Sequence, residues 1–416
     1  MNSKTARAEG STRRLLSSGR VIRLRAILAY SLGPVLGLIS GPILARSLGA
    51  EGRGQFAAIM QPISVAAAVA SVGIPTAVAF FIAKSYDRRR TLYIGLVVCL
   101  PTALLTYLGM AWYATIVSQA QGISVSLLWA LWTAIILSAF VQIIRAFWQG
   151  VGGWRRLDWE RAVFAILRFG AVCVVAAAGI AVAGPYAVAA LLAFVAAAAV
   201  LFIPRRELAI STDKTPHVRD IVKYSTSASL GTVAIVASSR LDQVALPSAT
   251  SATELGFYAV AVTVAEVPMV FGVLAARNIL QSVASGVGVK RSLIEVKSYL
   301  AVGIIGCVLA VGLSPMLIPL VFGSDFQDSV VSVQVLAISS IYSILTMSAI
   351  SLLSGLGYPL VSSLVPLVSV IVTATLFISF WHSMTSLTAA KISLGSQVAA
   401  FLASLIACLY LKNRRR

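Results

Sequence analysis

Charge is scarce in this chain. Charged residues make up 11% of its 416 residues and only 14 residues are acidic, whereas an ordinary soluble domain has about 25% charged residues. Hydrophobic residues make up 59%, and the mean hydropathy is +0.92. This balance excludes a chain that exposes most of its surface to water. Apolar runs such as Val172 to Ala183 do not alternate with polar residues, which excludes the strands of a transmembrane β-barrel.

Cysteine and histidine are also rare, and their positions exclude two kinds of site. Each of the four cysteines lies inside an apolar run, so neither a disulfide framework nor a CxxC metal site is available. The two histidines are far apart in the sequence, in polar connections. We therefore expect no metal and no cofactor. The residues are Cys99, Cys173, Cys307, Cys408, His217 and His382.

Long apolar runs dominate what remains, and they predict an all-α polytopic membrane protein. About 20 helical residues cross ~30 Å of hydrocarbon, and runs of that length recur from one end of the chain to the other. We predict twelve transmembrane helices over residues 26–45, 56–83, 91–117, 127–148, 163–183, 186–203, 225–245, 257–283, 300–322, 330–353, 360–381 and 387–411.

Basic residues cluster on alternate connections between these runs. The formal charge of +19 suggests a nucleic-acid partner at first, but the charges follow the asymmetry of cytoplasmic loops instead. We therefore expect no nucleic acid, and a multi-pass protein of the bacterial inner membrane with both termini in the cytoplasm. The exception is the first outer connection, which contains Arg46 and Arg53.

The longest polar interruption, Pro204 to Lys223, divides the chain near its middle. We predict a basic cytoplasmic tail (1–25), a six-helix bundle (26–203), a cytoplasmic linker (204–223), a second six-helix bundle (224–411) and a basic cytoplasmic end (412–416). Short matches between the halves predict a parallel pseudo-two-fold repeat, although such matches also arise by chance in Ala- and Gly-rich sequence. The matches pair Glu51, Gly54, Phe56 and Ala57 with Glu254, Gly256, Tyr258 and Ala259, and Gln149, Gly150 and Gly152 with Ser354, Gly355 and Gly357.

Three segments resemble a known family. SLGAEGRGQFAA (47–58) resembles the start of the second helix in oligosaccharide flippases, the Wzx-like members of the multidrug, oligosaccharidyl-lipid and polysaccharide exporter superfamily. SSRLDQVALPSATSATELGFYAVA (238–261) and PLVFGSDF (319–326) are similar to later parts of the same family. The resemblance implies a two-lobed bundle that moves a polyprenyl-pyrophosphate-linked oligosaccharide to the outer leaflet by alternating access, for polysaccharide biosynthesis. It also implies membrane lipids and polysaccharide polymerase or export machinery as partners.

Arginines inside the predicted spans are the candidates for substrate binding. An ionisable side chain at the bilayer centre costs at least ~2.5 kcal/mol, and the planar guanidinium forms bidentate bonds with phosphate. Two alternatives stay open, because Glu51 is available to pair with the first two candidates and long side chains near helix ends reach toward headgroups by default. The predicted pyrophosphate- and sugar-binding residues are Arg46, Arg53, Arg145, Arg168, Arg240 and Arg277.

Two acidic residues are the candidates for ion coupling, Glu266 and Asp242. Glu266 lies nine residues beyond Phe257, about 13 Å along a helix, and thus near the membrane midplane. Arg277 follows eleven residues later on nearly the same helix face, and we expect this stripe to face the substrate path. The alternative for Glu266 is a structural ion pair with an arginine of a neighbouring helix.

Two other function classes would require different sequence features. A cation-coupled multidrug exporter of the same superfamily would favour an acidic, aromatic cavity, whereas this chain has more intramembrane Arg than Asp or Glu. A membrane-embedded polysaccharide polymerase or glycosyltransferase would need a large outer loop, and the predicted outer connections are all short. We therefore predict no catalytic residues and no enzymatic activity.

Overall fold

The computed structural model describes residues 3–209, 214–286 and 288–414. The predicted tail, linker and carboxyl end each extend into residues outside these ranges. Within them every regular element is a helix, as the apolar runs predicted. The elements are α1 (Ser3–Ser71), α2 (Ile74–Ala83), α3 (Arg88–Gln121), α4 (Val125–Trp132), α5 (Ala134–Gly150), α6 (Trp154–Ala177), α7 (Ala183–Ala198), η1 (Ala199–Leu201), α8 (Arg205–Leu208), α9 (Val218–Ala249), α10 (Ala252–Ala284), α11 (Val289–Phe322), η2 (Ser324–Phe326), α12 (Ser329–Gly355), α13 (Pro359–Ser379), η3 (Trp381–Ser383) and α14 (Ser386–Arg414).

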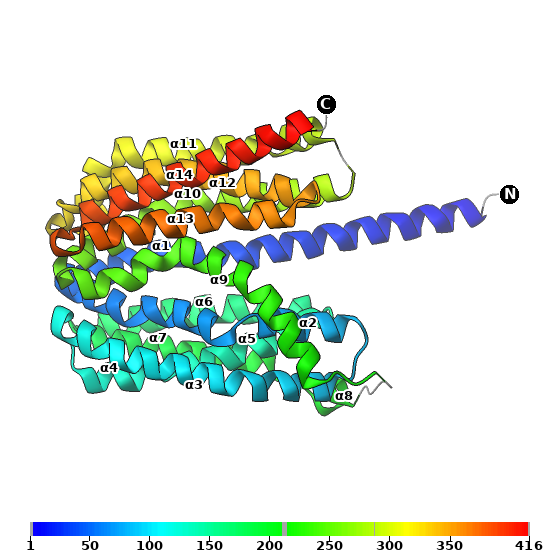
Figure 1. Ribbon diagram of the computed structural model, residues 1–416, viewed down its shortest axis with the longest axis horizontal. Helices are drawn as coiled ribbons and strands as arrows, with labels where there is room; N and C mark the ends of the chain where they lie inside the picture. The colour runs from blue at the N-terminus through cyan, green and yellow to red at the C-terminus, as the bar shows by residue number, and fades with distance from the viewer. Residues whose placement is uncertain (1–2, 210–213, 287, 415–416) are drawn as a thin grey trace.

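The helices account for about twelve crossings of a membrane. Nine helices in the described ranges are long and apolar enough to span one. The helix α1 crosses twice, because it reverses at Gly49, whose φ of 65° suits glycine. The helices α6 and α9 contain more charge but also run along the bundle (Figure 1).

Figure 1 shows two lobes side by side. The first contains α2 to α7 with the second segment of α1 (residues 50–71), and the other contains α10 to α14. The first segment of α1 (residues 3–48) runs between them. The start of α1, α8 and the end of α14 lie at one end of the bundle, called the linker end here. The reversal of α1 and the α9–α10 connection lie at the opposite end, called the kink end.

The helix α9 belongs to both lobes. Near the linker end its Tyr224 ring stacks on Phe80 of α2, with 4.5 Å between ring centroids, and Ile221 is buried in the same cluster. Beyond this point α9 packs against α13 of the other lobe. The chain therefore passes from one lobe to the other along a helix.

The second predicted span breaks near its middle. Val72 and Gly73 have φ of 40° and 69°, and Pro75 lies in the first turn of α2, where its missing N–H costs no hydrogen bond. A Cβ built on Gly73 would lie 2.5 Å from the carbonyl oxygen of Ser225. The break therefore lets α9 approach the first lobe backbone to backbone.

Matched glycines confirm the predicted repeat. A Cβ at Gly54 would lie 1.7 Å from the carbonyl oxygen of Ala252, and a Cβ at Gly256 would lie 1.9 Å from that of Ala50. The contact is reciprocal, as a two-fold axis requires. Ala50 with Gly54 and Ala252 with Gly256 are both small-xxx-small pairs, which let membrane helices approach closely.

The second matched pair takes equivalent places in the two lobes. A Cβ at Gly150 would lie 2.8 Å from Cβ of Ile82, at the end of α2, and a Cβ at Gly355 would lie 3.0 Å from Cβ of Val283, at the end of α10. Each glycine therefore lets the helix that contains it pack against the end of the second span of its own lobe.

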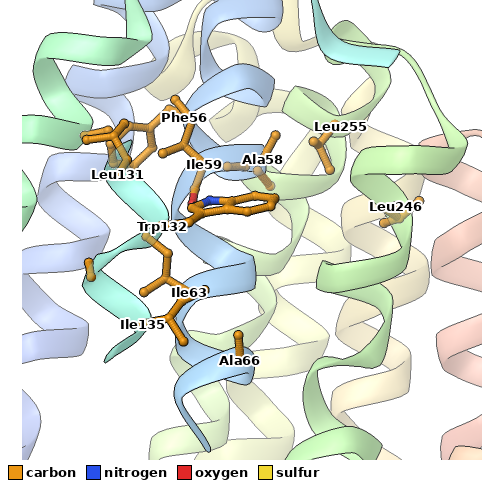
Figure 2. Packing of buried hydrophobic residues seen from close by; sticks show 14 of the residues in the cluster. Phe56, Ala58, Ile59, Ile63, Ala66, Leu131, Trp132, Ile135, Leu246 and Leu255 are labelled. Carbon is orange, nitrogen blue, oxygen red and sulfur yellow. The ribbon is translucent and has the colours of Figure 1, made fainter. Parts of the chain in front are cut away.

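The buried core continues across both lobes near the kink end. Figure 2 shows Trp132 beside Ile59 and Ile63 of α1, with Leu246 of α9 and Leu255 of α10 close by. The indole Nε1 of Trp132 donates a 3.0 Å hydrogen bond to the carbonyl oxygen of Ile59. Both residues are buried, and a buried indole N–H needs a hydrogen-bond acceptor, which the carbonyl oxygen supplies.

Polar side chains also join the lobes at the kink end. Gln121, at the end of α3, is 2% exposed, and its Nε2 donates 2.8 Å hydrogen bonds to the carbonyl oxygens of Pro247 and Thr250. The Tyr113 hydroxyl donates to the carbonyl oxygen of Val244. The last carbonyls of a helix have no partner within it, so Gln121 of the first lobe supplies donors at the end of α9, and Tyr113 adds a donor one turn earlier.

Candidate functional site

A basic cavity of about 210 Å³ lies between the first segment of α1, α5 and α6. The helix α1 contributes Gly33 and Gly37, whose lack of side chains leaves the space open. The facing helices contribute three arginines and one glutamate, so the lining has net positive charge. These residues are Arg145 of α5 and Glu160, Arg161 and Arg168 of α6.

Two of the three arginines have carboxylate partners. Arg145 forms a forked pair with Glu160, with Nη2–Oε1 at 2.6 Å and Nε–Oε2 at 3.2 Å, and Glu160 is 1% exposed. The ring of Phe194 lies under the Arg145 guanidinium, 5.9 Å from centroid to Cζ. Arg161 Nη1 lies 3.8 Å from Asp158 Oδ1. The two guanidiniums are therefore anchored rather than extended to headgroups.

Arg168 differs from these two. Among the described residues no acidic side chain lies within ion-pair distance of its guanidinium. It is close enough to Arg53 for the two positive charges to repel each other. An anion that entered the cavity would stabilise this charge.

Arg53 links the lobes at the kink end. It is 8% exposed, its Nη2 donates a 3.4 Å hydrogen bond to Thr263 Oγ1 of α10, and its guanidinium lies 5.7 Å from the Phe56 ring centroid. Its Nε has no hydrogen-bond partner among the described residues. Arg53 is thus a second buried cation with unused hydrogen-bonding capacity.

Arg46 has a different place. Its Nε donates a 3.1 Å hydrogen bond to the carbonyl oxygen of Val321, and its Nη2 donates to that of Leu320. These carbonyls are at the end of α11, where a cation complements the helix dipole. Arg46 therefore caps a helix of the other lobe instead of pairing with Glu51.

A larger cavity, of about 410 Å³, lies inside the second lobe among α9, α10, α12, α13 and α14. Arg240 lines it and pairs with Glu266, Nη1–Oε1 2.9 Å, and the same Nη1 donates a 3.0 Å hydrogen bond to Gln243 Oε1. Asp242 accepts a hydrogen bond from the Tyr258 hydroxyl. Arg240 and Asp242 therefore have separate partners, as their two-residue spacing predicted.

The predicted set is thus divided by the fold. Arg145 and Arg168 line the basic cavity, Arg240, Asp242 and Glu266 line the larger one, and the arginines at the kink end line neither. Arg277 is exposed and lines neither cavity. Of the stripe predicted to run from Glu266 to Arg277, only the Glu266 end therefore lines a cavity. The ion pair of Glu266 is the structural alternative that the sequence left open, and its role in ion coupling stays a prediction.

Sequence reasoning missed Glu160 and Arg161 because their charged surroundings resembled a loop. The predicted span began at residue 163, but α6 begins at Trp154. The seven-residue spacing from Arg161 to Arg168 is two helical turns, which places both on one face, and this signal was available. The hydroxyls that line the larger cavity were missed because Ser and Thr also serve ordinary helix packing in membranes.

Comparisons with known proteins agree with this architecture. The chain matches a family model described as polysaccharide biosynthesis protein over residues 24–280. No curated protein matches the chain. An inward-facing multidrug resistance MATE family transporter of the MOP superfamily superposes with a TM-score of 0.70, at 16% identity, over 94% of this chain and 98% of the other.

Two further solved structures share the fold. The lipid II flippase MurJ, in an inward closed conformation, superposes with a TM-score of 0.70 at 14% identity, over 92% of this chain and 86% of the other. An outward-facing MATE family transporter superposes with a TM-score of 0.60 at 16% identity, over 94% of both chains. The fold is therefore that of the MOP transporters, and, since the family model covers more than half of its residues, the chain belongs to the polysaccharide biosynthesis protein family.

Proposed function

We propose that this membrane protein translocates a polyprenyl-pyrophosphate-linked oligosaccharide across the bacterial inner membrane by alternating access, with no bond made or broken. The observation that carries the proposal is Arg168, a cation in a cavity whose other two arginines already have carboxylate partners. A pyrophosphate would supply the missing anion. The planar guanidinium suits it, because it forms two parallel hydrogen bonds and remains charged when water is removed.

The charge of the cavity distinguishes this proposal from multidrug export. Organic cations would be repelled by a lining with three arginines and one glutamate. The family membership supports polysaccharide biosynthesis as the process, and the flippase among the structural neighbours supports a lipid-linked substrate.

The direction follows from topology, which we propose from the placement of basic residues. With the basic clusters in the cytoplasm, the linker end faces the cytoplasm and the kink end faces outward. The lobes touch at the kink end through Gly54, Gly256 and Gln121. The structure would then have its outer side closed, and the substrate would enter the basic cavity from the cytoplasmic side.

Transport in liposomes tests the proposal. The purified protein is reconstituted with a fluorescent polyprenyl-pyrophosphate-linked sugar, and the rate at which the sugar becomes accessible on the far side is measured. Hydrogen bonds between charged groups are worth about 1.5–3 kcal/mol, which corresponds to roughly 10- to 150-fold. We expect Arg168→Ala to lower the rate by about that factor and Arg168→Lys, which keeps the charge but loses the fork, to lower it by less.

The matched control is Arg89→Ala, which removes an exposed arginine at the start of α3. We expect it to transport at the wild-type rate. Wild-type transport by both Arg168 variants, at normal abundance, would remove the basic cavity from the mechanism and with it the support for a pyrophosphate substrate.

A further inference from the structure

The larger cavity, inside the second lobe, has many hydroxyl groups in a lining that is otherwise mostly apolar. Serine and threonine are its most frequent lining residues, and they come from α9, α12, α13 and α14. At about 410 Å³ the cavity falls in the size range of small-molecule sites, and it has room for far more than one ion. Such a surface suits a ligand with both hydroxyl groups and apolar faces, because polar groups inside a membrane protein need polar partners.

The hydrogen bonds of these hydroxyls leave capacity for a ligand. Ser340 Oγ donates to the carbonyl oxygen of Ala265 at 3.1 Å, and Ser343 Oγ donates to that of Ser339 at 3.2 Å. Each such hydroxyl has used its one donor and keeps acceptor lone pairs. The hydroxyls of Thr346 and Ser369 have no partner among the described residues, although these residues are only 5% and 2% exposed. The wall therefore offers acceptors, and the two hydroxyls without partners lie buried behind it.

The charges of this cavity disfavour the pyrophosphate. The lining contains one arginine, Arg240, and two acids, Asp242 and Glu266. The arginine is already paired with Glu266 at 2.9 Å, so a phosphate would have to displace this carboxylate to reach it. Both carboxylates also have hydrogen-bonding partners, and a bound metal cation would have to displace them. A neutral ligand rich in hydroxyls needs neither a free cation nor a free carboxylate, and it therefore fits this lining.

We propose that the hydroxyl-lined cavity binds the sugar portion of the transported lipid, as one or more neutral pyranose units. The inference rests on the proposed function and divides the substrate between the lobes, with the pyrophosphate at the arginines of the first lobe and the sugar in the second. The side-chain amide of Gln397, which also lines the cavity, offers one donor side and one acceptor side, a combination that matches a pair of adjacent sugar hydroxyls.

The experiment compares two lipids on the purified full-length protein. One is polyprenyl pyrophosphate without sugar, and the other is the same lipid with a single glucose, galactose, N-acetylglucosamine or N-acetylgalactosamine. Affinities are measured by displacement of a fluorescent polyprenyl pyrophosphate. We expect at least one sugar-bearing lipid to bind more tightly than the sugar-free lipid to the wild-type protein.

Variants locate this gain. Ser340→Ala and Ser343→Ala each remove one acceptor hydroxyl of a residue that lines the cavity. A hydrogen bond corresponds to roughly 2- to 12-fold in affinity, and we expect each variant to reduce the sugar-dependent gain by a factor in that range and to leave the affinity for the sugar-free lipid unchanged. The control is Thr375→Val, which changes an exposed threonine of α13 outside the cavity.

The outcomes separate this inference from the proposed function. Failure of the sugar-free lipid to bind the wild-type protein would count against the proposed function itself. Binding of that lipid with no gain from any of the four sugars, or with equal losses for both lipids in the variants, would overturn the sugar site and leave the flippase standing. Saturable binding of radioactive sodium that is lost in Ser343→Ala would overturn it in favour of a cation site.

Discussion

The reciprocal glycine contact at the kink end predicts that replacing one glycine by alanine, which adds a methyl group, will separate the lobes. The backbones of α1 and α10 are so close at Gly54 that an added Cβ would lie 1.7 Å from the carbonyl oxygen of Ala252 and 2.9 Å from the amide nitrogen of Gly256. A carbon–oxygen contact needs about 3.3 Å. Gly54→Ala therefore requires the two helices to move apart by about 1.6 Å.

The cost of this movement falls on the contact between the lobes. The clashing atom is a backbone carbonyl held in its own helix, so Ala252→Gly cannot relieve the clash. Overpacking of a well-packed contact costs about 1–3 kcal/mol. The lower part of this range, one or two kcal/mol, changes an equilibrium by roughly 5- to 30-fold. We expect Gly54→Ala to shift the protein by this factor toward the form in which the outer ends are apart.

Labelling of a single cysteine measures the shift. Thr263 lies at the contact, near Gly41 and bonded to Arg53, and Thr263→Cys in a background without the native cysteines reports access from the kink end. We expect a membrane-impermeant maleimide to label it about 5- to 30-fold faster when Gly54→Ala is added. The control is Gly109→Ala on α3, where an added Cβ would meet nothing within 4 Å.

Two results would refute this reasoning. Wild-type labelling and wild-type thermal stability in Gly54→Ala would show that the backbones are not in contact at this glycine. An equal acceleration by Gly109→Ala would show that any added methyl group loosens the bundle. Gly256→Ala provides an independent check, because its Cβ would lie 1.9 Å from the carbonyl oxygen of Ala50 and should give the same shift.

Four further predictions concern pairs and topology. Arg145→Leu leaves the buried carboxylate of Glu160 unpaired and should lower the free energy of unfolding by about 3–5 kcal/mol. The double variant, Arg145→Leu with Glu160→Leu, should recover most of this stability in thermal unfolding, and no recovery would contradict the pairing. Gln121→Leu removes two hydrogen bonds to the end of α9 and should speed labelling from the kink end, which an unchanged rate would disprove. Glu266→Gln should fold normally and abolish any dependence of transport on a proton or sodium gradient; a wild-type response in liposomes would remove Glu266 from ion coupling. Lys214→Cys should resist an impermeant reagent in intact cells, because basic clusters place the linker in the cytoplasm, and labelling there would reverse the proposed topology.

The positions of helix breaks were partly readable in the sequence. Gly73 with Pro75 two residues later is a pattern that favours a break, and the matched glycines predicted the repeat, whereas their contact appears only in the structure. The start of α6 was not readable, because the charged stretch before residue 163 looks like a connection when lipid is assumed to surround every helix. Its charges are stable there because Glu160 and Asp158 pair with arginines inside the protein.

The sequence by itself determined that this is an all-helical membrane protein with about twelve crossings and two similar halves. Three features can be read from the sequence alone: the length of each apolar run, the alternation of basic connections and the spacing of repeated glycines. The membrane imposes the first two directly. Only the tertiary structure decided which ionisable residues meet. Arg240 reaches Glu266 of another helix, Arg53 reaches Thr263 from 210 positions away, and Arg168 has no acidic partner among the described residues. A helix surrounded by lipid is apolar on nearly every side, so its sequence contains little information about its rotation around its own axis. That rotation decides whether a side chain lies in a cavity, in a contact between the lobes or at the surface.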